Sequence, residues 1–152
     1  MASITVERIA NLAVVRLARA EARNALTVAM AQELTAALAG VSADDACRVV
    51  VLAGDGATFC AGLDLKAAIA EGPENAPEWM ALQEVFSGLI EQIRKMRQPV
   101  IGAIQGAAVG AGLGIALACD VRIAAPSAQF MVGAVNWASA RASAVSVITC
   151  PA

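Results

Sequence analysis

Two stretches of the sequence are rich in small residues and could present backbone N–H groups to a ligand. They are residues 54–66 and residues 99–120. Each comes after a predicted strand and before a predicted helix. The first N–H groups of a helix have no partner within it and carry a partial positive charge, so either stretch suits an anionic oxygen.

The glycine spacing in the second stretch leaves more than one meaning open. Gly110, Gly112 and Gly114 do not form the G-x-G-x-x-G pattern of a dinucleotide site, and no G-x-x-x-x-G-K-[ST] phosphate loop occurs. Close packing of glycine and alanine without a ligand is one remaining interpretation. The other is an oxyanion hole, in which two separated backbone N–H groups stabilise a negatively charged oxygen. The spacing by itself does not choose between these two.

Few side chains could move a proton or attack a substrate. The chain contains no histidine, which excludes histidine-dependent triads and removes the commonest general base, and no metal site is expected. Cys60 and Ser127 have no base predicted nearby, so we expect a structural role for both. The cysteines show no C-x-x-C spacing and are predicted to be free thiols in a reducing compartment: Cys47, Cys60, Cys119 and Cys150.

The bulk composition narrows the class of protein. A chain of 152 residues is long enough for one domain with a sizeable core. Its net charge of −2 and 11 scattered basic residues provide no basic groove for nucleic acid. The N-terminus lacks the basic and apolar regions of a signal peptide, so a cytoplasmic protein is expected.

The apolar pattern predicts alternating strands and helices that position the two small-residue stretches. Runs of β-forming residues at 4–8 and 13–17 predict a hairpin. Thr27 is placed to cap a helix whose apolar residues recur at helical spacing. Further strands are predicted at residues 48–53, 100–104 and 121–124, and further helices over the apolar stripe from 79 to 93 and over 113–119.

Residues 100–118 have a second interpretation. Only Gln105 is strongly polar in this segment, whose length approaches that of a membrane span. Glycine also recurs every fourth residue from Gly102 to Gly114, as it does in close-packed membrane helices. A strand, a turn and the start of a helix are the alternative, because glycine and proline interrupt the periodic pattern.

The order of three motifs resembles the crotonase, or enoyl-CoA hydratase/isomerase, superfamily. Residues 59–66 (F-C-A-G-L-D-L-K) and the long segment 99–120 are similar to its two signature segments, and residues 21–26 (E-A-R-N-A-L) look like its first coenzyme A loop. The likeness covers about residues 10–133. It implies an α/β fold with a soluble, crotonase-like ββα spiral core, which we place at residues 1–135, and it disfavours the membrane helix.

The resemblance also implies a site for an acyl-CoA thioester, with coenzyme A as part of the substrate and no separate cofactor. In this family two backbone N–H groups hold the thioester carbonyl, and the corresponding positions fall on Ala61 and Ala111. For Arg23 and Lys66 a solvated surface charge is an equally good interpretation. The positions expected to line the coenzyme A or acyl pocket are Ala22, Arg23, Gly62, Leu63, Asp64, Lys66 and Gly110.

The acid and base that hydratases of this family use are two glutamates, and the corresponding positions hold Gly114 and Ala134. Neither residue can transfer a proton, so we expect hydratase activity to be impaired or absent. Asp120 is expected to be structural, as a cap or in an ion pair beside Arg122. The leading hypothesis is therefore a family member that binds acyl-CoA through an oxyanion hole. A non-catalytic subunit that associates with longer crotonase-like chains is the alternative, and a thioester isomerase or hydrolase with another acid is a third.

Residues 136–152 depart from the family pattern. The family continues with a G-L-x-P-type segment and with helices that cover the pocket and build a trimer or hexamer, whereas this chain matches neither. A shifted reading frame or an early stop after about residue 135 is our hypothesis for this difference. Loss of the helical trimerisation segment is expected to disfavour the homo-oligomer and to expose apolar core.

Overall fold

The fold is built around a mostly parallel sheet, described here from a computed structural model that covers residues 2–70, 75–133 and 148–149. In these residues the main sheet has the strand order β1-β2-β3-β4-β6-β8, and a second, two-stranded sheet pairs β5 with β7. The strands are β1 (Ile4–Ile9), β2 (Leu12–Leu17), β3 (Val49–Gly54), β4 (Val100–Ile104), β5 (Ala107–Val109), β6 (Val121–Ala124), β7 (Gln129–Met131) and β8 (Ile148–Thr149).

The main sheet begins with the predicted hairpin and continues with parallel strands. β1 and β2 pair antiparallel, with Val6 opposite Val15. β2, β3, β4 and β6 are then parallel neighbours, and Val51 lies between Val14 and Ile101. Parallel pairs need a crossover connection between their strands, which is usually a helix. The sequence supplies those helices between β2 and β3, between β3 and β4, and between β4 and β6.

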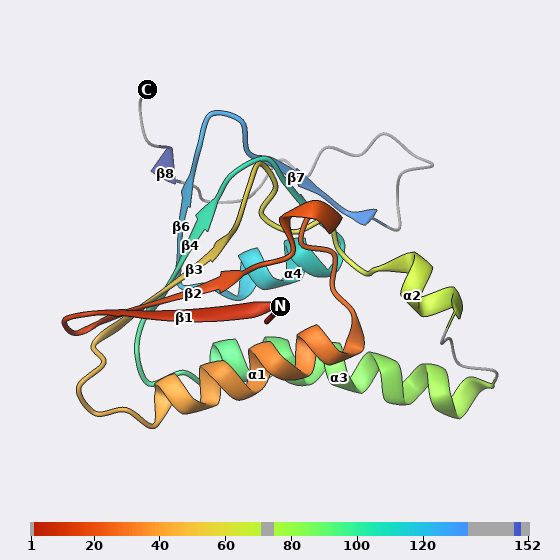
Figure 1. Ribbon diagram of the computed structural model, residues 1–152, viewed down its shortest axis with the longest axis horizontal. Helices are drawn as coiled ribbons and strands as arrows, with labels where there is room; N and C mark the ends of the chain where they lie inside the picture. The colour runs from red at the N-terminus through yellow and green to blue at the C-terminus, as the bar shows by residue number, and fades with distance from the viewer. Residues whose placement is uncertain (1, 71–74, 134–147, 150–152) are drawn as a thin grey trace.

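Two long helices lie side by side and cover one face of the main sheet (Figure 1). They are α1 (Val28–Ser42) and α3 (Ala76–Arg94). The Thr27 hydroxyl accepts a hydrogen bond from the Met30 N–H at 3.1 Å, so the predicted cap of α1 is confirmed. The shorter helices are η1 (Ala20–Ala22), α2 (Leu65–Ala70) and α4 (Ala111–Ala118).

The core lies between the helices and the main sheet. The residues of α1 that point to it recur at helical spacing, as the sequence predicted, and belong to one buried cluster with alternate residues of β2, β3 and β4. Core side chains exposed by less than 2% of their surface include Leu17, Met30, Leu34, Leu38, Val50, Leu52, Phe59, Leu89 and Ile115.

The glycine-rich segment from β4 onward is not one helix. β4 ends at Ile104, β5 follows, and α4 begins at Ala111, two residues earlier than the sequence predicted. Gly106 and Gly110 adopt positive φ angles of 55° and 53°, which L side chains disfavour and which turn the chain at both ends of β5. In the described part of the chain no helix has the length and apolarity to cross a membrane. The strand-and-turn interpretation is therefore confirmed.

The first testable prediction concerns the cap of α1. Thr27→Ala removes the acceptor for the Met30 N–H and should lower the free energy of unfolding by about 0.5–2 kcal/mol. Thr35→Ala is the matched control, because the Thr35 hydroxyl only donates to the Ala31 carbonyl within the helix. Urea unfolding followed by circular dichroism measures the free energy of unfolding of both variants. Equal losses for the two variants would contradict the capping role.

Candidate functional site

A cavity of about 620 Å³ opens where the first turn of α4, the loop after β3 and helix α3 meet. Figure 1 shows α4 lying between the α1–α3 layer and the loops that join the strands. The lining is mostly apolar, and Gln83 and Ser87 are the only polar side chains among the described lining residues. The lining residues are Leu26, Ala61, Gly62, Leu63, Leu65, Gln83, Phe86, Ser87, Leu89, Ile90, Val109, Gly110, Ala111, Gly114, Ile115 and Gly133.

Several backbone N–H groups at this cavity have no acceptor among the described residues. Those of Leu63 and Ala111 are among them. Ala111 is the first residue of α4, so its N–H has no partner within the helix. The helix dipole adds partial positive charge at this end. Both groups are therefore available to a ligand oxygen.

The predicted donor Ala61 requires a correction. Its N–H already donates to the Arg23 carbonyl oxygen at 3.0 Å. An unpaired donor of this loop lies two residues further on, at Leu63. The sequence analysis missed this, because a motif shows which loop contains small residues but not which of its N–H groups are hydrogen-bonded in the fold. Ala111 stays a candidate donor.

The orientation of the Leu63 N–H follows from a short parallel bridge between Leu26 and Leu63. The Leu26 N–H donates to the Gly62 carbonyl at 2.7 Å, and the Asp64 N–H donates to the Leu26 carbonyl at 2.9 Å. Successive backbone groups of an extended chain point to opposite sides, so the intervening Leu63 N–H points away from Leu26. The bridge thus fixes the direction of the free donor.

Glycine allows the two donor loops to approach each other. A Cβ atom on Gly62 would lie 2.7 Å from the Val109 carbonyl oxygen and 3.7 Å from the Ala111 nitrogen, and Gly62 has a φ of 93°. Gly112 faces the backbone and side chain of Cys60 with even less room. Side chains at either position would force the loops apart, so these glycines have a steric role.

Asn24 and Arg19 hold the first loop against the second. The buried Asn24 amide donates to the Asp55 and Thr58 carbonyls at 2.9 and 2.8 Å, and its Oδ1 accepts the Arg19 N–H. The Arg19 guanidinium donates to the Ala25 carbonyl at 2.8 Å and pairs with Asp64 at 3.2 Å. The sequence analysis named neither Asn24 nor Arg19 as a site residue.

Asp64 is a structural carboxylate in this arrangement. The Ala67 N–H, at the start of α2, donates to its Oδ1 at 3.2 Å. This hydrogen bond, together with the Arg19 guanidinium, holds the pKa of the Asp64 carboxyl below its usual value. Asp64 is therefore ionised at neutral pH and cannot act as a general acid there.

The predicted binding residues divide into two groups. Gly62, Leu63 and Gly110 line the cavity, as Ala61 and Ala111 do. Four others lie outside its lining. Of these, the Arg23 and Lys66 side chains are exposed, so both interpretations of their charge stay open. The four residues outside the lining are Ala22, Arg23, Asp64 and Lys66.

The described lining of the cavity contains no side chain that titrates near neutral pH. Gly114, which occupies one of the two glutamate positions, does line it. A Cβ atom there would be 3.5 Å from Ile90 Cδ1, an ordinary contact, so a longer side chain could be accommodated. Ala134, the other position, lies outside the described residues.

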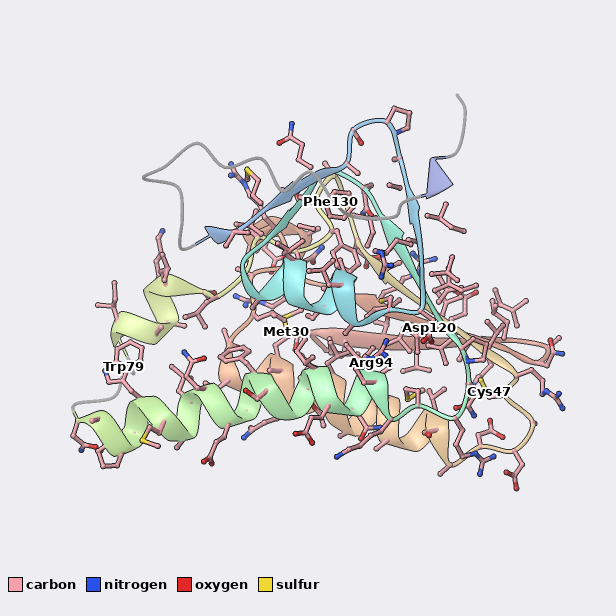
Figure 2. All side chains as sticks on the ribbon, turned by 180° about the vertical axis from the view of Figure 1, so that it is seen from behind. Met30, Cys47, Trp79, Arg94, Asp120 and Phe130 are labelled. Atoms are coloured by element: carbon pink, nitrogen blue, oxygen red, sulfur yellow. The ribbon has the colours of Figure 1, made fainter. Side chains whose placement is uncertain are left out.

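The remaining candidates for chemistry have structural partners. The Cys60 thiol is buried and donates to the Asn24 carbonyl at 3.2 Å, and burial raises its pKa to about 11. Asp120 accepts a hydrogen bond from the Val100 N–H, at the start of β4, at 2.8 Å and lies 3.9 Å from Arg94 (Figure 2), so the expected structural role is confirmed, with Arg94 as the ion-pair partner. The Ser127 hydroxyl accepts the Gly106 N–H at 3.4 Å.

Comparison with known proteins covers most of the chain. A family model described as enoyl-CoA hydratase/isomerase matches residues 7–146. A probable enoyl-CoA hydratase of Rhodobacter capsulatus is 46% identical over 120 residues, which cover 79% of this chain and 45% of that protein. A probable peroxisomal enoyl-CoA hydratase 1 of Arabidopsis thaliana is 37% identical over 79% of this chain and 43% of that protein. The chain thus spans less than half the length of these relatives.

Solved structures agree with the sequence comparison. An enoyl-CoA hydratase/carnithine racemase from Magnetospirillum magneticum has a TM-score of 0.81 and 36% identity, covering 86% of this chain and 49% of that chain. An enoyl-CoA hydratase/isomerase from Xanthobacter autotrophicus has a TM-score of 0.82 and 31% identity, covering 85% and 48%. The predicted crotonase-like α/β architecture of the core is therefore confirmed.

The second prediction concerns the loop that Asn24 holds. Asn24→Ala removes one acceptor and two donated hydrogen bonds from a buried position with a φ of 54°. Each buried group left unpaired costs about 1–3 kcal/mol, and three groups lose their partner, so the free energy of unfolding should fall by at least about 3 kcal/mol. Asn11→Ala, in the exposed hairpin turn, is the control and should change it by less than about 0.5 kcal/mol. An Asn24 variant as stable as the Asn11 variant would contradict the role of the Asn24 side chain in holding this loop.

The third prediction concerns the Cys60 thiol. With a pKa of about 11, only about 0.1% of the thiol is ionised at pH 8, and the group is buried. The native chain at pH 8 should therefore leave Cys60 unmodified by iodoacetamide, while the urea-unfolded chain should be alkylated there. Peptide mass spectrometry reads out the site. Rapid alkylation of Cys60 in the native chain would restore it as a candidate nucleophile.

Proposed function

Because the chain belongs to the enoyl-CoA hydratase/isomerase family, we propose that it binds an acyl-CoA thioester at the cavity between α3 and α4. The thioester carbonyl oxygen accepts hydrogen bonds from the Leu63 and Ala111 N–H groups. The observation that supports this most directly is that both unpaired donors line the same, mainly apolar cavity. The names of the related hydratases and isomerases favour the same class of ligand.

The physical basis of binding is electrostatic. A carbonyl oxygen that gains negative charge is stabilised by donors fixed in advance, more strongly in an apolar cavity than in water. Both proposed donors are backbone groups that carry no titratable proton, so this contribution is independent of pH over the neutral range. The partial positive charge at the start of α4 acts in the same direction.

Binding is not accompanied by an efficient hydration reaction in this proposal. Addition of water to an enoyl thioester needs a base to take a proton from water and an acid to protonate the α-carbon. The described cavity lining has a glycine at position 114 and no carboxylate elsewhere. A general acid or base contributes about 10²–10⁴-fold to the rate, so the hydratase rate is expected to be low.

A second candidate function is favoured by exposed apolar side chains on β6 and α4. Val121 and Ile123 of β6 and Leu117 of α4 are each at least one-third exposed among the described residues. Such a surface is typical of protein contacts. In this alternative the chain is a non-catalytic module that associates with longer proteins of its family. Native mass spectrometry with and without acyl-CoA separates a ligand-binding monomer from a subunit that requires a partner.

The fourth prediction tests the donor pair and the missing acid separately. Ala111→Pro removes the N–H at the first helical position, where proline is tolerated, and should weaken butyryl-CoA binding at least tenfold in calorimetric titration. Ala111→Ser keeps the donor and should bind like the wild type. Thermal melting checks that both variants fold.

The corresponding kinetic measurement uses crotonyl-CoA. The wild type should hydrate it at no more than a small fraction of the rate of a family hydratase. Gly114→Glu adds a carboxylate beside Ile90 without a steric clash, so this variant should keep its affinity for crotonyl-CoA. Equal butyryl-CoA affinity of Ala111→Pro and Ala111→Ser would contradict the proposed donor. Efficient hydration by the wild type would contradict the proposed loss of acid–base chemistry.

A further inference from the structure

The segment from residue 19 to residue 26 holds the loop after β3 on both sides of Leu63. The Leu26 N–H donates to the Gly62 carbonyl at 2.7 Å, and the Asp64 N–H donates to the Leu26 carbonyl at 2.9 Å. Residues 62 and 64 are therefore paired, whereas no described residue accepts the N–H of the residue between them. The direction of that N–H depends on how firmly this short bridge is held.

The Arg19 guanidinium closes the bridge at one end. Its Nη1 donates to the Ala25 carbonyl oxygen at 2.8 Å, and its Nη2 donates to Asp64 Oδ2 at 3.2 Å. Ala25 adjoins Leu26 in the chain, and Asp64 adjoins Leu63. One rigid, planar group thus ties together the residues next to the two bridge partners, and it does so with a fork of donors that an ammonium group lacks.

The ion pair is partly shielded from water. The side chains of Arg19 and Asp64 are 26% and 16% exposed. In the surface pair Arg97–Asp45 the corresponding values are 62% and 87%. The other carboxylate oxygen of Asp64, Oδ1, accepts the Ala67 N–H at 3.2 Å. Both oxygens are therefore held by donors, and reduced solvent screening makes this charged contact stronger than an exposed one.

Neither side chain of the ion pair belongs to the wall of the cavity. Arg19 and Asp64 are absent from the described lining, whereas Leu63 is part of it. An effect of the ion pair on a bound carbonyl must therefore pass through the backbone of the loop. A hydrogen bond weakens steeply when its angle at the hydrogen falls below about 120°, so rotation of the peptide group before Leu63 would remove most of its strength.

We propose that Arg19 and Asp64 are positioning residues for the Leu63 N–H, and that their ion pair determines how strongly the bound thioester carbonyl is polarised. The inference rests on the proposed function, because the direction of this N–H matters only when a ligand oxygen accepts from it. It extends that function by assigning part of the oxyanion hole to a charged contact outside the cavity. Donors whose direction is fixed before binding stabilise a developing charge without the cost of reorganisation.

The test measures the carbonyl stretching frequency of ¹³C-labelled butyryl-CoA bound at saturation, together with its affinity by calorimetric titration. Asp64→Asn keeps the shape and an oxygen for the Ala67 N–H but removes the charge that holds Arg19. One of two donors then loses its alignment, so the shift on binding should fall by roughly half. The affinity should weaken by about two- to tenfold. Asp45→Asn, which removes the surface ion pair with Arg97, is the matched control and should change neither quantity.

Two further variants test whether the residues act through each other. Arg19→Gln combined with Asp64→Asn should reduce the shift no more than Asp64→Asn alone, because the second substitution removes a partner that has already lost its contact. Arg19→Lys keeps the positive charge, but an ammonium group does not reproduce the fork that reaches both the Ala25 carbonyl and Asp64. This variant should also reduce the shift by roughly half. Thermal melting checks that each variant folds.

The outcomes separate this inference from the proposed function. A wild-type chain that does not bind butyryl-CoA, or that binds it without a shift, would overturn the proposed function itself. A shift that is present in the wild type and unchanged in Asp64→Asn would overturn the positioning role and leave the thioester site intact. Equal losses in Asp64→Asn and Asp45→Asn, or a further loss in the double variant, would also overturn it. Should Asp64→Asn fail to fold, Arg19→Lys must reduce the shift for the inference to stand.

Discussion

The site depends on the contact between two stretches of backbone that have no side chains between them. At Gly62 the loop after β3 meets the Val109 carbonyl, and at Gly112 the first turn of α4 meets Cys60. This contact brings the Leu63 and Ala111 N–H groups to one cavity, and it buries the Cys60 thiol. Glycine at positions 62 and 112 is thus required for the packing of the two segments, and the site depends on that packing.

Backbone donors and side-chain acids respond differently to sequence change. The N–H of Ala111 persists whatever side chain is attached to it, provided that the residue is not proline and α4 keeps its start. Proton transfer, in contrast, requires a particular side chain, and position 114 holds none. The described lining therefore keeps backbone N–H donors, whereas none of its side chains titrates near neutral pH.

The strands, helices and order of the core were largely predictable, because β3 and β4 are continuous apolar runs and α1 carries a clear helical stripe with Thr27 at its start. β5 and β7 were not predicted as strands, since three residues are too few to show an alternation. The Gly102–Gly114 spacing mimicked a membrane helix because both structures need close backbone approach.

The site was predictable only at the level of its loops. The motifs identified the two loops, but Ala61 was wrong as a free donor because its partner, the Arg23 carbonyl, comes from a left-handed turn that no local pattern reveals. Asn24 and Arg19 were missed for a related reason. Their importance lies in hydrogen bonds to segments up to 45 residues away, which spacing along the chain does not encode.

The central claim is that two backbone N–H groups polarise a bound thioester carbonyl, and isotope-edited infrared spectroscopy measures that polarisation directly. Butyryl-CoA labelled with ¹³C at the carbonyl should show a lower carbonyl stretching frequency when bound to this chain than when free in water, because fixed donors in an apolar cavity weaken the C=O bond more than water does. The shift should be smaller in the Ala111→Pro variant. A bound carbonyl with the same frequency as the free ligand, or with a shift that Ala111→Pro leaves intact, would contradict the account.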